Sequence, residues 1–261
     1  MSPGAELTVD VDGGIARVVL NRPEHLNALN GALLDAIVST FAELDRADDV
    51  RVVCLSGAGH RGFSAGADLK EMNARDGGGS APYLPMTGPS RNVYEVVLEC
   101  RKPTLAVLHG WVVGGGMELA MACDLRIAAE GTRLMLPESK VGLGANFGSQ
   151  MLPRLVPAGI AYQMLYLGEP LEVDEARRFG LVNWVVPRDE LDERAEAVAT
   201  TLVQRAPLTL RRYKAMVQLG STLPISTALR LDPGPSPYLS EDRAEGAAAF
   251  VEKRAPRWTG R

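Results

Sequence analysis

A glycine-rich segment that ends in a glutamate is the part of this sequence best suited to chemistry. It reads Gly114-Gly115-Gly116-Met117-Glu118 and runs into the apolar stretch Leu119-Ala120-Met121-Ala122. The pattern predicts a helix that begins at the glycines, where backbone N–H groups lack partners within the helix and the helix dipole favours negative charge. The segment therefore predicts a place where an oxyanion is stabilised beside a carboxyl group that can act as acid or base.

The sequence leaves two interpretations of the Glu118 carboxyl. A glutamate in the first turn of a helix is stabilised by the helix dipole and needs no further role. Its neighbours Met117 and Leu119 are apolar, however, and partial burial raises the pKa of a carboxyl toward the range that suits proton transfer. A second glutamate, Glu138, follows Pro137 in a predicted loop and on its own indicates a surface charge.

Other common chemistries find no support in the sequence. The spacing of the three histidines is not that of a zinc-protease site; they are His25, His60 and His109. The three cysteines are scattered without a C-x-x-C pair; they are Cys54, Cys100 and Cys123. The run from Gly142 to Gly148 misses the dinucleotide fingerprint because its last glycine comes one position late. No phosphate-binding loop and no serine nucleophile elbow occur. The sequence therefore predicts no metal site.

Composition narrows the class of protein. The chain has 261 residues, 46% of them hydrophobic, and a formal net charge of -4, which predicts one globular domain with at most a small appendage. The slightly acidic balance disfavours nucleic acid as a partner. The N-terminus lacks a signal-peptide pattern, and no apolar run reaches membrane-spanning length. We expect a protein of the cytoplasm, with neither nucleic acid nor membrane as a partner.

Strand and helix patterns alternate along the chain and predict an α/β domain. Expected strands cover residues 7–11, 15–20, 50–55, 104–108, 125–128 and 182–186; expected helices follow Asn30, begin near Gly115 and occupy stretches within 148–167. Asn30 is a predicted N-cap. From Leu191 the pattern is helical and interrupted by prolines, so we expect a core over residues 1–194 and a helical region over 195–261. Residues 74–91 and the stretch around Gly234 are predicted to be mobile, the first as a lid.

Taken in order, four segments resemble the enoyl-CoA hydratase/isomerase (crotonase) family over nearly the whole chain. Two segments are similar to that family's CoA-binding stretches, Asn21–Leu29 and Ser64–Met72. Its glycine-rich signature resembles Gly114–Ala120 with Cys123-Asp124, and the segment with its second glutamate resembles Pro137-Glu138. The segments at Glu245-Gly246 and Phe250–Arg254 resemble its C-terminal helix. The resemblance implies an α/β spiral of β-β-α units with a helical C-terminal trimerisation region, assembled as a homotrimer or homohexamer.

The same resemblance implies roles for individual residues. The backbone N–H groups of Ala67 and Gly115 become an oxyanion hole for the thioester carbonyl, and Glu118 and Glu138 become the catalytic pair. The expected substrate or CoA contacts are His25, Leu26, Ala28, Ala65, Gly66, Asp68, Leu69, Gly114, Pro137, Tyr238, Phe250 and Lys253. No cofactor is expected, because coenzyme A enters as part of the acyl-CoA thioester substrate.

The pair of glutamates favours one reaction among those that the family performs. A 2-enoyl-CoA hydratase needs both, whereas a Δ3-Δ2 enoyl-CoA isomerase can move one proton with Glu138 alone, and a non-catalytic acyl-CoA-binding paralogue needs neither. Because both are present, we expect hydration, with the isomerase or another reaction of the family as the alternative and the binding protein last. The segment Gly144–Met151 departs from the family pattern, which leaves the shape of the acyl pocket open.

Overall fold

The computed structural model describes residues 6–77 and 91–261 and, within the helix that ends at Gly77, the side chains as far as Ala74. Two sheets organise these residues. The larger has the order β1 (Leu7–Asp12), β2 (Ile15–Leu20), β3 (Val52–Gly57), β5 (Thr104–Leu108), β7 (Leu125–Ala129) and β10 (Trp184–Val186). The smaller has the order β4 (Gly62–Ser64), β6 (Trp111–Val113), β8 (Arg133–Met135) and β9 (Leu171–Glu172).

A repeating β-β-α unit connects the two sheets. β3, β5 and β7 lie side by side and parallel in the larger sheet. The strands that follow them, β4, β6 and β8, run parallel to one another in the smaller sheet, where β9 pairs antiparallel with β8. The helices that complete the units are α2 (Leu69–Gly77), α4 (Gly115–Ala122) and, after the short η2 (Glu138–Lys140), α5 (Asn146–Leu155). The expected α/β spiral of β-β-α units is thus confirmed.

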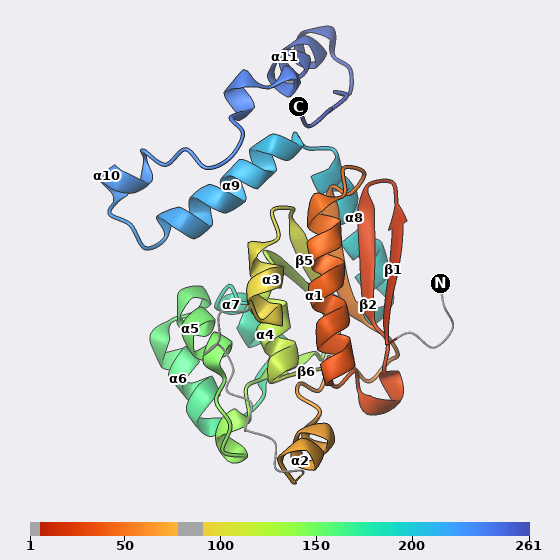
Figure 1. Cartoon of the computed structure of the whole chain (residues 1–261), viewed down its shortest axis with the longest axis vertical. Coiled ribbons are helices and arrows are strands. Elements are labelled where there is room, and N and C mark those ends of the chain that lie inside the picture. Colours follow the sequence, from red (N-terminus) through yellow and green to blue (C-terminus); the bar gives the residue numbers. More distant parts are fainter. Residues whose placement is uncertain (1–5, 78–90) are drawn as a thin grey trace.

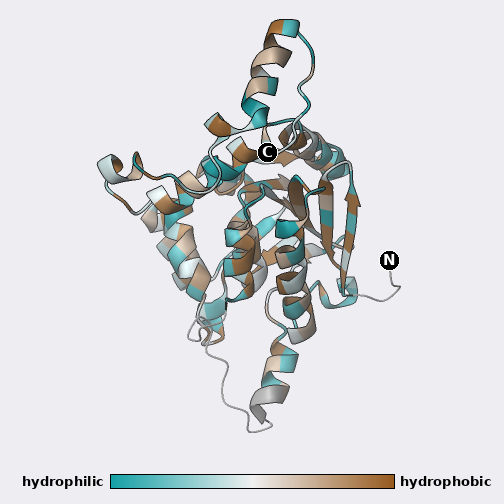
Figure 2. Ribbon diagram, turned by 45° about the horizontal axis from the view of Figure 1, so that its top comes forward, coloured by the Kyte–Doolittle hydropathy of each residue, from teal (hydrophilic) through white to brown (hydrophobic). Residues whose placement is uncertain are grey.

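Alternating side chains of the larger sheet build two cores. In β3, Val53 and Leu55 face the main core, whereas Val52 and Cys54 face the second. This alternation follows from the two-residue period of a strand, and a sheet buried on both faces is typical of parallel strands. The helices on the main-core side include α1 (Gly31–Arg46) and α3 (Val93–Glu99), and α8 (Leu191–Val203) covers the other face (Figure 1). Apolar residues accordingly gather in the strands and the inward sides of the helices (Figure 2).

Local signals set several element boundaries as the sequence predicts. The first two expected strands pair as an antiparallel hairpin, and β5 spans the predicted residues 104–108. The Asn30 side chain accepts a hydrogen bond of 2.9 Å from the Leu33 N–H and so caps α1. The helical stretches expected around residues 148–167 are α5 and α6 (Ala158–Leu167), separated at Val156-Pro157 because proline disfavours helical backbone in the preceding residue. The remaining short elements of this half are η1 (Pro23–His25), α7 (Val173–Arg178) and η3 (Arg188–Glu190).

The chain after α8 forms an arm, residues 207–261, that extends from the core (Figure 1). It contains α9 (Pro207–Gly220), α10 (Ile225–Ala228), η4 (Pro237–Leu239) and α11 (Glu241–Glu252). Lys214 of α9 ties the arm to the core through an ion pair of 2.9 Å with Asp124. The expected boundary at residue 194 falls inside α8, whose Ala195 and Val198 pack in the second core. The division into two domains stays a prediction.

Some expectations lie outside what this structure addresses. Of the segment 74–91 expected as a lid, residues 78–90 lie outside the described residues. Within the described parts of the chain, every helix is too short or too polar to cross a membrane. The cytoplasmic location stays a prediction.

Candidate active site

The first two CoA-like segments of the sequence are held together by backbone hydrogen bonds. The Leu29 N–H donates to the Gly66 carbonyl at 2.8 Å, and the Asp68 N–H donates to the Leu29 carbonyl at 3.0 Å. These two bonds form a parallel bridge between Leu29 and Ala67. Because successive peptide groups of extended backbone point to opposite sides, the N–H of Ala67 itself faces away from Leu29.

The side to which that N–H points is the start of α4. A Cβ atom built on Gly115 would lie 3.8 Å from the Ala67 nitrogen, and one built on Gly66 would lie 3.1 Å from the Gly115 nitrogen. Gly115 is the first residue of α4, so its N–H has no partner within the helix. Gly66 has a φ of +82°, which together with this close approach requires glycine. The two N–H groups expected to form the oxyanion hole therefore come together.

Glu118 lies in the first turn of α4, and only 5% of it is exposed. Its Oε1 accepts a hydrogen bond of 2.7 Å from the backbone N–H of Gly148, in the first turn of α5. Burial raises the pKa of the Glu118 carboxyl to about 7, against the opposing effect of that hydrogen bond and with a further increase from the charge of Glu138. Of the two interpretations that the sequence leaves open, the buried carboxyl with a raised pKa is the one that fits this geometry.

Glu138 begins η2 directly after Pro137 and faces the same end of α4. A Cβ atom built on Gly114 would lie 2.8 Å from Glu138 Oε1, so only a glycine leaves room for this carboxyl there. Its Oε2 is buried and has no hydrogen-bond partner among the described residues. Burial raises the pKa of this carboxyl as well. Glu138 is therefore not the surface charge that its loop position alone indicates.

A cavity of about 680 Å³ joins these groups, a volume typical of small-molecule sites. Five of the sequence-predicted site residues line it: Ala67, Asp68, Gly115, Glu118 and Glu138. Their neighbours in its wall are apolar side chains and a polar rim, among them Leu29, Leu34, Val38, Met72, Val93, Tyr94, Leu143, Phe147, Asn30, Asp35, Glu71, Arg91 and Asn92. The arrangement offers two N–H donors and two carboxyls to a ligand in one cavity.

The other predicted contacts lie outside that lining. In the core these are His25, Leu26, Ala28, Ala65, Gly66, Leu69, Gly114 and Pro137. Several of them hold the backbone in place; the Leu26 carbonyl, for example, accepts a hydrogen bond of 2.9 Å from the Ala65 N–H. Contacts of these residues with coenzyme A stay a prediction.

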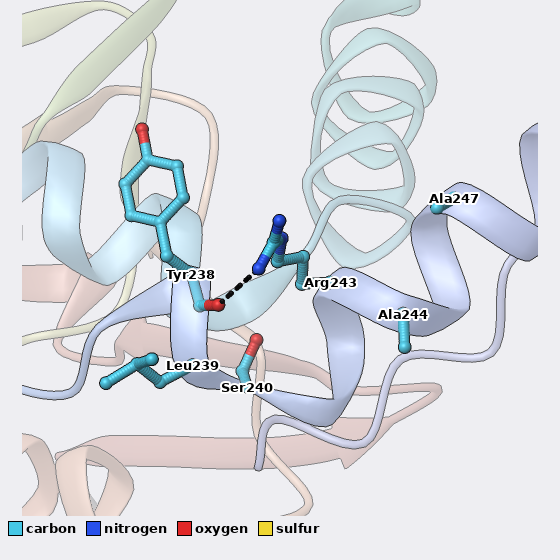
Figure 3. A pocket seen from close by; sticks show the side chains of 6 residues that line it. All are labelled: Tyr238, Leu239, Ser240, Arg243, Ala244 and Ala247. Carbon is cyan, nitrogen blue, oxygen red and sulfur yellow. Dashed lines mark hydrogen bonds between the residues drawn. The ribbon is translucent and has the colours of Figure 1, made fainter.

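Tyr238, Phe250 and Lys253 lie on the arm, at the opposite end of the molecule from α2 (Figure 1). Tyr238 borders a shallow hollow where Arg243 donates a hydrogen bond of 3.2 Å to its carbonyl oxygen (Figure 3). Phe250 is 86% exposed, and Lys253 ends α11 with left-handed backbone. Within one chain these three residues are thus remote from the glutamates.

Arg22 does not line the cavity but holds Asp68, which does, and the sequence did not reveal this role. Its guanidinium is largely buried, donates to the Ala28 carbonyl at 2.6 Å and pairs with Asp68 at 3.1 Å and with Glu6 at 3.0 Å. Burial opposes ionisation of Asp68, but the hydrogen bonds from Arg22 and from the backbone of Glu71 outweigh it and lower the pKa of this carboxyl. Arg22 thereby links both CoA-like segments.

Tyr94, Phe147 and Gly148 were also missed. Tyr94 of α3 and Phe147 of α5 stack with ring centroids 5.4 Å apart beside Glu118. A signal was present in part, because Phe147 and Gly148 lie in the segment Gly144–Met151 that departs from the family pattern. Nothing in the sequence around Tyr94 distinguishes it from a core tyrosine.

Comparison with known proteins agrees with this geometry. The sequence model of a protein family described as enoyl-CoA hydratase/isomerase matches residues 10–261. The chain belongs to this family. A short-chain-enoyl-CoA hydratase of Clostridium acetobutylicum is 36% identical over 252 residues, which cover 94% of each chain. An (E)-benzylidenesuccinyl-CoA hydratase of Thauera aromatica is 35% identical over 97% of this chain and 99% of its own. The crystal structure of an enoyl-CoA hydratase from Bacillus anthracis superposes with a TM-score of 0.88 at 32% identity, covering 98% of this chain and 100% of that one.

Proposed function

We propose that this enoyl-CoA hydratase/isomerase family member adds water across the double bond of a 2-enoyl-CoA thioester to give a 3-hydroxyacyl-CoA. The observation that carries the proposal is the pair of buried carboxyls, Glu118 and Glu138, at one end of α4 in the same cavity as the Gly115 and Ala67 backbone. Relatives at 35–36% identity over most of the chain are named as hydratases of CoA thioesters.

The two N–H groups supply the electrostatic part of catalysis. Attack of water at Cβ of an enoyl thioester moves negative charge onto the carbonyl oxygen. The N–H groups of Ala67 and Gly115 would donate to that oxygen and stabilise the enolate-like state more than the substrate. The dipole of α4, which starts at Gly115, acts in the same direction.

The two carboxyls supply the proton transfers. Glu118, in its ionised form, would take a proton from the attacking water while the oxygen bonds to Cβ, and Glu138, in its protonated form, would give a proton to Cα. The charge of an ionised Glu138 raises the pKa of Glu118, so the pair favours states in which one carboxyl is ionised and the other protonated; the reactive state is the one with the proton on Glu138. The proton balance closes when the proton on Glu118 is returned, by way of solvent, to Glu138.

Assays on a panel of CoA thioesters would decide between hydration and isomerisation. We expect hydration of crotonyl-CoA and little shift of the double bond of a 3-enoyl-CoA. Glu118→Gln and Glu138→Gln should each lower hydration by about 10²-fold, the usual loss when a general acid or base is removed. Glu130→Gln, which changes an exposed glutamate at a turn, is the matched control and should leave the rate unchanged.

Two results would contradict the proposal. A Glu118→Gln protein with full hydratase activity would remove this residue from the mechanism. If the protein isomerises a 3-enoyl-CoA faster than it hydrates crotonyl-CoA, and only Glu138→Gln abolishes that reaction, the isomerase becomes the function.

We also propose a homotrimer or a homohexamer. Large apolar side chains are exposed along the arm: Tyr213, Val217, Leu219, Leu223, Ile225, Leu229, Tyr238, Leu239, Phe250 and Val251. Such a concentration of exposed apolar side chains is typical of an interface between proteins. In an assembly, the arm of one subunit would bring Phe250 and Lys253 to the nucleotide part of a CoA bound by its neighbour, where the lysine meets phosphate charge.

A further inference from the structure

Tyr94 brings a phenolic hydroxyl to the face of α4 that carries the proposed catalytic groups. A Cβ atom built on Gly115 would lie 2.6 Å from Tyr94 Oη, so the hydroxyl lies directly over the start of the helix. The same hydroxyl forms a hydrogen bond with the carboxyl of Glu118. Residues three apart lie on one face of a helix, so Tyr94 contacts the face that presents both Gly115 and Glu118.

The surrounding structure fixes the position of this tyrosine. Its ring packs on Phe147, with centroids 5.4 Å apart and planes tilted by 32°. The start of α3 is fixed by a capping box in which Asn92 and Glu95 exchange side-chain to backbone hydrogen bonds. Because Phe147 precedes Gly148, the donor to Glu118 Oε1, the ring contact and that hydrogen bond come from the same turn of α5.

We propose that Tyr94 is a positioning residue that donates a hydrogen bond to the Glu118 carboxylate and, together with the Gly148 N–H, orients it toward the reacting water. This inference rests on the proposed hydratase function. The phenol acts on Glu118 and takes no part in the bonds that form or break.

The groups that act on Glu118 determine the sign of the expected effect. The Tyr94 hydrogen bond stabilises the ionised form and lowers the pKa of Glu118, as do the N–H groups of α5, while burial and the charge of Glu138 raise it. The charged side chains on the helices packed against α4 have other partners: Glu95 and Glu99 of α3 pair with Arg91, and Arg154 of α5 donates to the Gln150 carbonyl. β4 and β6, which also contact α4, carry no charged residue. Removal of the Tyr94 hydroxyl therefore has one expected direction, a higher pKa for Glu118.

Tyr94→Phe is the first variant to measure, because it removes one oxygen and keeps the ring contact. The acid limb of kcat/KM for crotonyl-CoA should move to higher pH by about half to one unit, the shift that corresponds to one hydrogen bond. The rate should fall about two- to fivefold at pH 7, more at lower pH and much less at pH 9, where Glu118 is ionised in either protein. Tyr166→Phe, at a tyrosine that is 71% exposed, is the control and should change neither the position of the acid limb nor the rate. An equal loss at every pH would overturn the proposal.

Two further measurements separate this inference from the proposed function and from a folding defect. In a Glu118→Gln background, Tyr94→Phe should cost little additional activity; a full further loss would show that Tyr94 acts by another route. An NMR titration of isotope-labelled glutamate reads the Glu118 pKa directly, so it decides the inference even if the wild-type protein hydrates no enoyl-CoA. If Tyr94→Phe does not fold, 3-fluorotyrosine at position 94, a stronger donor, should move the acid limb to lower pH, and an unchanged limb would reject the proposal.

Discussion

The Oε1 atom of Glu118 accepts a hydrogen bond of 2.7 Å from the backbone N–H of Gly148. This bond joins the first turn of α4 to the first turn of α5, so a carboxyl of one helix occupies a free N–H of the other. It favours the ionised form of a carboxyl whose burial favours the protonated form. With the resulting pKa of about 7, the ionised and the protonated carboxyl are both populated at neutral pH.

A methyl group at position 148 should disturb this bond. The Cβ of Gly148→Ala would lie 3.2 Å from Glu118 Oε1 and 3.2 Å from Leu136 Cδ1, so the carboxyl has to shift by a few tenths of an ångström. We expect a loss of about tenfold in kcat for hydration, since small displacements of a catalytic group are costly. Gly159→Ala, whose Cβ meets nothing within 4 Å, is the control. Equal activity of the two variants would contradict the prediction.

Removal of the Gly115 N–H should impair catalysis without preventing α4 from forming. Proline is tolerated at the first position of a helix, so Gly115→Pro removes the donor and leaves the helix. A loss of about 10²–10³-fold in kcat is expected for one oxyanion donor. Gly115→Ala adds a Cβ that meets Tyr94 Oη at 2.6 Å but keeps the N–H. If the alanine variant is as inactive as a folded proline variant, crowding and not the lost donor explains the effect.

The rate of hydration should depend on the ionisation of Glu118. Because the base must be ionised and its pKa is about 7, kcat/KM should rise with pH through a midpoint near that value. The raised pKa of Glu138, which acts as the acid, keeps this residue protonated to higher pH than usual. Initial rates with crotonyl-CoA between pH 5 and 9 test this. A profile that is already flat from pH 5 upward would mean that a carboxyl with an ordinary pKa is the base.

Loss of Arg22 should lower stability. Arg22→Met leaves the partly buried carboxylates of Asp68 and Glu6 without their ion-pair partner, and we expect a cost of about 2 kcal/mol in the free energy of unfolding. The pKa of Asp68 is lowered in the folded protein, so the contribution of its pair is complete above the unfolded value near 4 and is lost as the pH falls below it. Urea unfolding at pH 7 and pH 3 should show the larger difference at pH 7. If the wild type and Arg22→Met differ in free energy of unfolding by the same amount at pH 7 and pH 3, the ion pair is not the cause of the difference.

Charges on the arm should weaken the proposed assembly. Leu239 and Phe250 are 89% and 86% exposed in the single chain, so Leu239→Arg or Phe250→Arg costs little in a monomer but is unfavourable within an apolar interface. Light scattering should show a trimer or hexamer for the wild type and smaller species for the variants. Val11→Arg, on the hairpin, serves as the control. A monomeric wild-type protein that binds CoA normally would rule out the proposed role of the arm.

Features that depend on neighbours along the chain were determined by the sequence. The short apolar run of residues 104–108 gave a buried strand, Asn30 capped α1, and glycines followed by apolar residues started a helix with Glu118 in its first turn. The same apolar neighbours indicated one of the two interpretations of Glu118, burial with a raised pKa, and the structure has this carboxyl buried. Each of these depends on backbone geometry and periodicity over a few residues.

Only the tertiary structure decided which groups surround the carboxyls. Tyr94 and Gly148 reach Glu118 from two other helices, and Gly114 leaves room for Glu138, because the packing of whole elements sets these distances. A pKa depends on desolvation and on hydrogen bonds that oppose each other, so its value follows from that three-dimensional arrangement and not from the residue's neighbours in the chain. The same holds for Arg22, whose partners Glu6 and Asp68 lie far from it along the chain and meet it only in the folded structure.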